Sequence, residues 1–133
     1  TGTAMPSTND KENFMKLNPD CIRDILLTAE DTCDFSTPWT YDKDKEKSSF
    51  LANYSHEEIV YHIRQCYASD LIDGVQFYED GSTVYIGDLT PDGHEFLANI
   101  RNDTFFNKVK AIAEELGVLP LIISHKLQLI ALH

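Results

Sequence analysis

Histidines and cysteines are the side chains of this sequence best suited to metal binding or nucleophilic catalysis. His56 and His62 lack the i, i+4 spacing that places two imidazoles on one helix face for a metal, and His94 lies elsewhere. Cys66 lies beside an apolar stripe, and a cysteine in such a position is more often a small core residue than a nucleophile. We therefore expect no catalytic centre, no metal site and no cofactor.

Tyr61, Tyr78 and Tyr85 have the chemistry to stack on the bases of a single-stranded nucleic acid. Such sites also need a basic groove, because the phosphates must be neutralised. The 133-residue chain has 11 Lys and Arg against 22 Asp and Glu, a formal net charge of −11. This charge repels nucleic acid and anionic membranes and favours basic partners. Packing, or use in a protein interface, is the preferred interpretation of the tyrosines.

Cysteine content and hydropathy predict a cytoplasmic protein with no membrane association. Cys21, Cys33 and Cys66 are odd in number and lack a Cys-x-x-Cys spacing, so neither a disulfide framework nor a zinc ribbon is implied. No stretch approaches the ~20 apolar residues that cross a bilayer. Residues 1–14 lack the features of a signal peptide and predict a disordered leader, with one domain beginning near residue 15.

Two helices with clear start signals follow. Asn18 and Pro19 are typical of an N-cap and a first-turn proline, and Ser55 and Glu58 have the spacing of a capping box. We expect the second helix to end within residues 70–74, where Gly74 supplies the break. The buried stripes are Ile22, Ile25, Leu26 and Ala29 in the first helix and Ile59, Val60, Ile63 and Tyr67 in the second.

Residues 31–49 lie between these helices and alternate charges, which predicts a solvated loop. Trp39 and Tyr41 are its large apolar residues. They either pin the loop to the core or form a partner-binding loop, and the first interpretation is favoured. Residues 50–53 predict a short strand.

A hairpin and two more helices complete the domain. Two β-prone runs, 75–78 and 83–86, are joined by a turn containing Asp80-Gly81, a strong hairpin signal. Thr90 and Pro91 predict the start of a helix that buries Phe96, Leu97 and Ile100, and a further helix is expected at about residues 103–116. Residues 118–133 are apolar on too many sides to stand alone in water and predict a C-terminal helix that packs or dimerises.

This order of elements is that of winged-helix domains. The predicted fold class is mainly α with a small β-hairpin (α+β), a winged helix-turn-helix-like domain over residues 15–117 plus C-terminal helices. A fold of this type does not by itself define a function.

Three separated motifs resemble the DUF2513 family. They are residues 15–27 (MKLNPDCIRDILL), the second-helix start Tyr54-Ser55-x-Glu57-Glu58 with Tyr61-His62-Ile63, and residues 86–97 (IGDLTPDGHEFL). The resemblance covers roughly residues 15–117. It implies a bacterial or prophage setting, in which the family is common, and it supplies no catalytic residues.

The charge distribution favours a protein over DNA as the partner. In a DNA-reading winged helix, the helix before the wing enters the major groove, and a specific binder makes on the order of 6–10 phosphate contacts. Between residues 55 and 101, nine acidic residues stand against two basic ones. A few bases clustered in three dimensions, such as Lys43, Lys45, Lys47 and Arg64, could still form a local basic patch.

We therefore favour a non-enzymatic interaction module that binds a basic protein, such as an inhibitor or modulator of a host nucleic-acid-binding protein. A DNA-binding transcriptional regulator is the alternative. The predicted partner-binding residues are His56, Glu57, Tyr61, His62, Gln65, Glu79 and Asp80. The apolar tail predicts a homodimer, in which an isologous contact hides Leu121, Ile122, Leu129 and Ile130 from water.

Overall fold

The computed structural model describes the backbone of residues 17–116 and the side chains of residues 17–111. The predicted leader at residues 1–14, the tail at residues 118–133 and the proposed dimer residues Leu121, Ile122, Leu129 and Ile130 lie outside this part. The elements, in chain order, are α2 (Pro19–Thr32), β1 (Trp39–Asp42), η1 (Ser49–Leu51), α3 (His56–Ala68), β2 (Ile72–Asp73), β3 (Gln76–Tyr78), η2 (Glu79–Gly81), β4 (Thr83–Ile86), β5 (Asp88–Leu89), α4 (Pro91–Ile100) and α5 (Asp103–Leu116).

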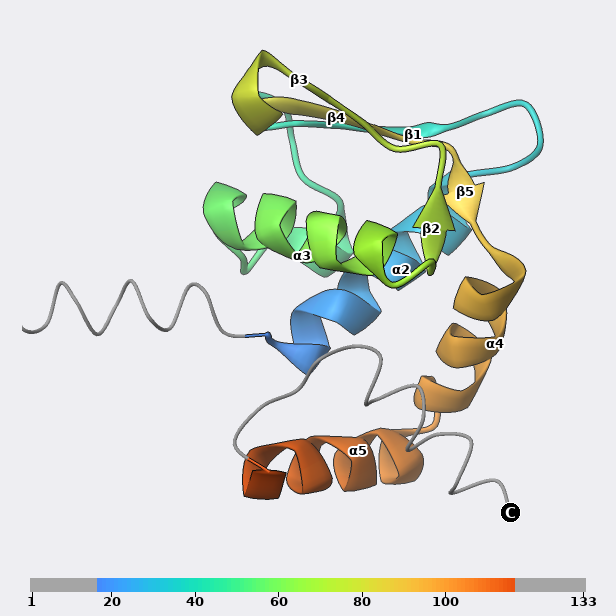
Figure 1. Cartoon of the computed structure of the whole chain (residues 1–133). Helices are drawn as coiled ribbons and strands as arrows, with labels where there is room; N and C mark the ends of the chain where they lie inside the picture. The colour runs from blue at the N-terminus through green and yellow to red at the C-terminus, as the bar shows by residue number, and fades with distance from the viewer. Residues whose placement is uncertain (1–16, 117–133) are drawn as a thin grey trace, which may run out of the picture.

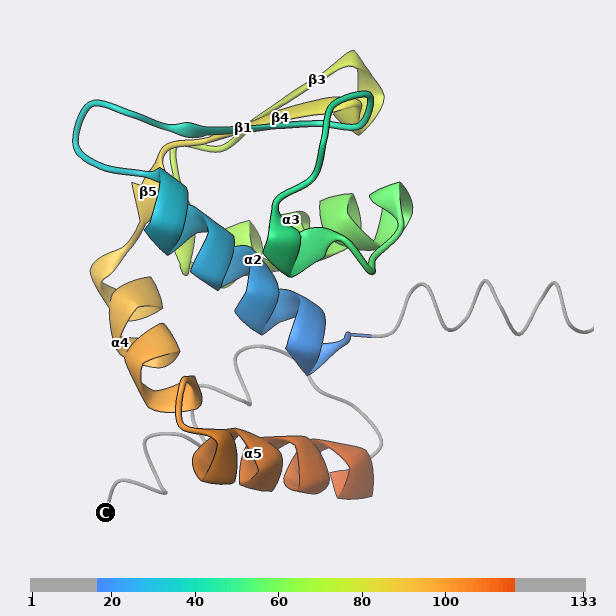
Figure 2. The same ribbon diagram turned by 180° about the vertical axis from the view of Figure 1, so that it is seen from behind.

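The helices lie on one side of a small antiparallel sheet (Figures 1 and 2). The sheet lies over α3, and α2 runs beneath α3, with α5 on the far side of α2. Helix α2 contacts α3, α4 and β5, so it is the central element of the core. The α+β fold class, mainly helical with a small β component, is confirmed.

Helices α2 and α3 begin where their capping residues predict. The Asn18 side chain accepts a hydrogen bond from the Asp20 N–H, and Pro19 occupies the first turn. Ser55 and Glu58 form the reciprocal bonds of a capping box at the start of α3. These bonds satisfy backbone N–H groups that a helix start otherwise leaves without partners.

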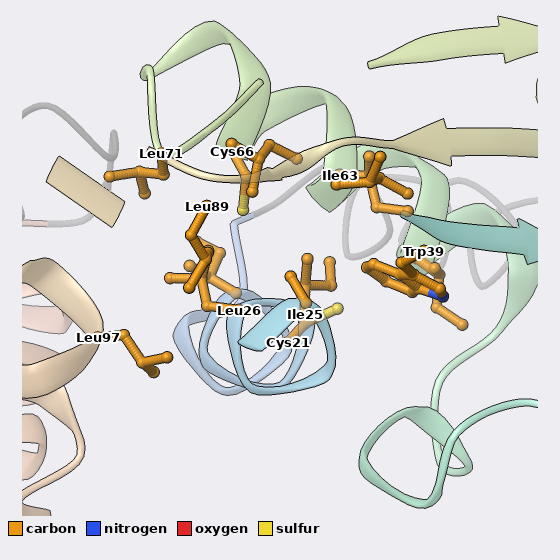
Figure 3. Close-up of a cluster of buried hydrophobic side chains, with 14 of the residues drawn as sticks. Cys21, Ile25, Leu26, Trp39, Ile63, Cys66, Leu71, Leu89 and Leu97 are labelled. Carbon is orange, nitrogen blue, oxygen red and sulfur yellow. The ribbon is translucent and has the colours of Figure 1, made fainter. Parts of the chain in front are cut away.

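The buried face of α3 is rotated from the predicted one. Ile59 and Ile63 are buried as expected, but Tyr67 is 46% exposed, and His62 and Cys66 are buried in its place. Positions 59, 62, 63 and 66 have the i, i+3, i+4, i+7 spacing of a single helix face. Figure 3 shows Cys66 of α3, Leu26 of α2 and Leu97 of α4 pointing into one cluster.

The end of α3 also differs from the prediction. The helix ends at Ala68, and Asp70, at φ 62°, is the residue with a left-handed backbone that directly follows it. Gly74 also has a left-handed backbone, at φ 63°, but it lies after strand β2 and so does not end the helix. The Leu71 N–H donates to the Cys66 carbonyl at 2.9 Å, which is a bond of the Schellman type. Aspartate tolerates this conformation better than most non-glycine residues, because its short polar side chain bonds locally.

The sheet has the order β1-β4-β3, with β4 in the centre. The predicted hairpin of β3 and β4 is confirmed, with Phe77 opposite Val84. The loop prediction for residues 31–49 is wrong at β1, where Trp39 pairs with Ile86. Trp39 and Tyr41 are buried, as the favoured interpretation of these residues required. The strand predicted at residues 50–53 is instead the 3-10 turn η1, which buries Leu51.

Helix α4 starts in direct contact with the chain that leaves α3. The Thr90 N–H donates to the Leu71 carbonyl at 3.1 Å, and the Thr90 hydroxyl caps the Gly93 N–H at 2.9 Å. A Cβ atom on Gly93 would lie 2.0 Å from the Leu71 oxygen. Glycine is therefore required here by the close approach of two backbones.

Helix α5 is held against α2 by cations and one aromatic ring. Arg23 and Lys110 both lie over the Phe106 ring, at 4.6 Å and 4.7 Å from its centroid. Arg23 also pairs with Asp103 at 3.1 Å, and Lys110 with Asp20 at 3.2 Å. In the part of the chain that the structure describes, no helix is long and apolar enough to cross a membrane.

Candidate functional site

The predicted wing, the hairpin of β3, η2 and β4, packs against α3. A side chain added at Gly81 would lie 3.3 Å from Cγ1 of Val60, so the tip of the wing touches the helix. Nearer the base, the Arg64 guanidinium lies 4.7 Å above the centroid of the Phe77 ring. Val60 and Arg64 are four residues apart and share one face of α3. The wing therefore follows this face.

Three predicted partner-binding acids lie on the exposed part of this assembly. Glu57 is exposed in the first turn of α3, and Glu79 and Asp80 are exposed in η2. Val60 is three residues from Glu57, on the same side of the helix, and it contacts the tip that carries the other two carboxylates. The wing tip and the start of α3 are thereby brought together as one acidic edge.

The remaining predicted residues of α3 are partly packed inside. His56 is half-buried: its ring stacks on Tyr41 at 5.6 Å, and its Nδ1 lies 2.7 Å from the Tyr41 hydroxyl oxygen in a hydrogen bond. Burial raises the pKa of Tyr41 to about 12. Tyr61 and Gln65 are half-buried, and the Tyr61 ring meets His62 edge-on. These three residues present only part of their surface to a partner.

The prediction that His62 is exposed is wrong. The side chain is fully buried, and its Nε2 accepts a 2.8 Å hydrogen bond from the Asn18 N–H. Its Nδ1 lies 2.7 Å from the Glu58 carbonyl oxygen. A backbone N–H only donates and a carbonyl only accepts, so the ring is neutral with its proton on Nδ1. Burial lowers the pKa of His62, and the side chain joins α2 to α3 instead of meeting a partner.

Most basic groups in the described part of the chain are engaged internally. Arg101 pairs with Glu30, and Lys47 donates to the Tyr54 carbonyl oxygen at 2.7 Å. Arg64, the basic residue of α3, stacks on Phe77. Within the predicted local basic patch, Lys47 is thus bound to a backbone carbonyl and Arg64, although exposed, is held against a ring. Among the side chains of residues 17–111, the basic residues without an ion pair or ring contact are Lys43, Lys45, Lys47 and Lys108.

The cysteines have the environment of core residues. All three are free, and Cys21 and Cys66 are buried. Burial raises the pKa of Cys66 to about 12, and it raises that of Cys21 further. A thiol with such a pKa is a poor nucleophile at neutral pH, because the thiolate is the reactive form. Among the described residues, no group of three or more histidine, cysteine, aspartate or glutamate side chains is arranged to hold a metal ion.

A model of one protein family matches the sequence over residues 16–119, and its description is "Hypothetical protein (DUF2513)". The chain belongs to this family. An uncharacterised protein of Haemophilus influenzae is 31% identical over 101 residues, which cover 72% of this chain and 76% of the relative. No solved structure matches the chain.

The DUF2513 motifs noted in the sequence hold the fold together in this member. Asn18 of the first motif caps α2 and bonds to His62 of the second. Thr90 and Gly93 of the third motif fix the start of α4 against Leu71. These motif residues of the DUF2513 protein thus position α2, α3 and α4 against one another. Glu57 of the acidic edge belongs to the second motif but takes no part in these contacts, and Glu79 and Asp80 lie outside the three motifs.

Proposed function

We propose that this protein is a non-enzymatic interaction module whose acidic edge binds a basic protein. The observation that supports this most directly is the state of the charges on α3 and the wing. Three acids, Glu57, Glu79 and Asp80, are exposed there, against one exposed base, Arg64, which is stacked on Phe77. A basic protein would be steered to such a surface, and the complex would weaken as salt rises.

A nucleic-acid-binding protein is the partner class that we propose, because its phosphate-binding surface carries the required positive charge. Occupying that surface would inhibit or modulate the partner. We propose that the protein acts in the cytoplasm of a bacterium. Its gene would be of bacterial or prophage origin. The three free cysteines are consistent with a reducing compartment.

The experiment compares two isosteric neutralisations of equal charge. The first variant combines Glu57→Gln, Glu79→Gln and Asp80→Asn. The control combines three exposed acids elsewhere, Asp31→Asn, Asp92→Asn and Glu95→Gln. Both variants lose three negative charges, so an effect of net charge alone would be equal in the two.

Affinity capture from a bacterial lysate should recover a basic protein with the native chain and with the control variant, but not with the edge variant. Raising the salt concentration should release it, and duplex DNA should compete for the same partner. Equal capture by both variants would show that the acidic edge is not the binding surface. Recovery of no partner at low salt would contradict the proposed function.

A DNA-binding regulator is the second candidate, and one observation favours it. The order α2, β1, α3, β3 and β4, with β4 between β1 and β3, is the arrangement expected of a winged-helix domain. Titration of a labelled duplex at several salt concentrations distinguishes the candidates. Nanomolar binding with a steep salt dependence would favour the regulator over the protein-binding module.

We also propose that the chain is a homodimer formed through its apolar tail, a proposal that rests on the sequence alone. Light scattering should give the mass of a dimer, and substitution of Leu121 and Ile122 by Ser should give the mass of a monomer. A monomer at all concentrations of the native chain would contradict this proposal.

A further inference from the structure

The outer face of the β1-β4-β3 sheet is a second surface with a distinct chemistry. Alternate residues of each strand point away from the core, because side chains along a strand alternate between its two faces. The pairing places Thr40, Tyr85 and Gln76 in one row across the sheet and Asp42, Thr83 and Tyr78 in the next. The described helices all lie on the opposite side (Figures 1 and 2).

Two tyrosines make this face aromatic. Tyr78 is 48% exposed and Tyr85 is 40% exposed. The Tyr78 hydroxyl donates a hydrogen bond to Oε1 of Gln76, which is the neighbour of Tyr85 in the adjacent strand. The Tyr78 side chain therefore extends along β3 toward Gln76, the cross-strand neighbour of Tyr85, and we call these three residues the platform.

Carboxylates outnumber bases around this platform, although exposed Lys43, whose N–H donates to the Ser82 carbonyl oxygen at 2.9 Å, lies at the same end of the sheet. Asp42 lies in the same face, and Glu79 and Asp80 follow Tyr78 directly at the wing tip. No lysine or arginine lies within β1, β3 or β4; the nearest bases in sequence, Lys43 and Lys45, lie in the turn after β1. An aromatic face bordered by carboxylates attracts a cation both through its rings and through its charge.

We propose that this sheet face is a docking surface for an arginine-bearing segment of the protein partner. A guanidinium stacks flat on an aromatic ring and at the same time pairs with a carboxylate, whereas a lysine ammonium is a strongly hydrated point charge. Within the chain, Arg23 lies over Phe106 and pairs with Asp103, and Arg64 lies over Phe77. Lys110 also lies over Phe106 and pairs with Asp20, so the expected difference between arginine and lysine is one of degree. The carboxylates disfavour nucleic acid, an anionic membrane and a second copy of this chain as occupants.

This inference rests on the proposed function, because it names the chemistry by which a basic partner is recognised. It adds a surface beyond the acidic edge of α3 and the wing. The test uses the isotopically labelled full chain and two short peptides of equal charge, one alternating arginine with glycine and the other lysine with glycine. Amide NMR spectra report which residues respond to each peptide.

The arginine peptide should shift the amide signals of Thr40, Gln76 and Tyr85. It should bind more tightly than the lysine peptide, by about 2- to 5-fold for each ring that is stacked. Equal affinities for the two peptides, or an absence of shifts on the sheet, would overturn the inference. A thymidine oligonucleotide that shifts the same signals would also overturn it, because the face would then be a base-stacking surface.

Substitutions of the two tyrosines distinguish the effect of losing the aromatic rings from the effect of unfolding. The double variant Tyr78→Ala, Tyr85→Ala should lose the preference for arginine, while Tyr78→Phe, Tyr85→Phe should keep it because the rings remain. Tyr67→Ala removes an exposed tyrosine of α3 and serves as the matched control. If the alanine pair were unfolded in a thermal melt, the phenylalanine pair and the residue map would still decide the question.

The two proposals fail in different ways. Shifts confined to Glu57 and Gln65 on α3 would overturn the sheet face as the docking surface and leave the acidic edge standing. Failure of the lysate capture would contradict the proposed function by its own test, whatever the peptides do.

Discussion

The Asn18 N–H donates a hydrogen bond to Nε2 of His62, at a distance of 2.8 Å. This bond joins the start of α2 to the middle of α3, and it requires His62 to be neutral. Because burial lowers the pKa of His62 in the folded chain, the unfolded chain binds a proton first as the pH falls below about 6.5. This site therefore contributes stability above that pH and loses it progressively below.

Urea denaturation at about pH 7.5 and about pH 5.5 should accordingly show a lower free energy of unfolding at the acid pH. His62→Leu should be destabilised by roughly 2 kcal/mol at the higher pH, because the Asn18 N–H loses its partner. It should also show a smaller difference between the two pH values. His94→Gln, at an exposed position, is the control. An unchanged pH dependence in His62→Leu would contradict the neutral role of this histidine.

The stacking of Arg64 on Phe77 is expected to couple the wing to α3. A double-mutant cycle of Arg64→Gln and Phe77→Leu should give an interaction energy of about 0.5–1 kcal/mol, the range for an exposed cation–π pair. Lys45→Gln, a basic residue without an ion pair or ring contact in the described structure, is the matched control. A cycle that closes with no coupling would mean that the contact does not stabilise the wing.

Substitution of Gly93 should be among the most destabilising single changes. In Gly93→Ala, the Cβ would lie 2.0 Å from the Leu71 oxygen, so α4 must move away from the end of α3. We expect a loss of about 3 kcal/mol or more in the free energy of unfolding. Ala98→Ser, an exposed change in the same helix, should cost about 0.5 kcal/mol. A native-like thermal midpoint for Gly93→Ala would show that the backbones are farther apart.

The capping box of α3 gives a smaller and separable effect. Ser55→Ala removes the acceptor for the Glu58 N–H and should cost about 1 kcal/mol in chemical denaturation. Ser49→Ala, at an exposed position in η1, should be nearly neutral. If the two serine variants were equally stable, the cap would not be contributing.

Thiol labelling tests the assignment of the cysteines to the core. In the native state, half-exposed Cys33 should react first with a thiol reagent, although burial raises its pKa as well. Cys21 and Cys66 should react at a rate limited by opening of the fold, and all three should react at once in denaturant. Fast reaction of all three thiols in the folded protein would contradict the described packing.

Sequence patterns predicted the elements whose signals are local. Asn18, Ser55 and Thr90 cap helices where they were expected to, and the Asp-Gly turn joins the predicted hairpin. Strand β1 was missed because its partner is distant: Trp39 pairs with Ile86, and nothing near β1 in the sequence reports that pairing. Its neighbouring charged residues resembled a loop instead.

The candidate site was predicted only in part, because some of its residues depend on contacts with distant parts of the chain. Glu57, Glu79 and Asp80 are exposed as expected, since charged side chains seldom lie in a core. His62 was misplaced because its burial depends on partners for both ring nitrogens, and one of these partners is the distant Asn18. The stacking of Arg64 on Phe77 likewise depends on how the wing packs, which no local pattern in the sequence determines.

The wing is fixed at both of its ends. At its base, β2 pairs with β5, and the Gly87 N–H donates to the Asp73 carbonyl oxygen at 2.9 Å; at its tip, Gly81 meets Val60. A hairpin restrained in this way has little freedom to hinge, so its surface is already formed before any encounter. Docking should then proceed as between rigid bodies, with a small ordering penalty, and variants of the interface should differ mainly in how fast the complex dissociates.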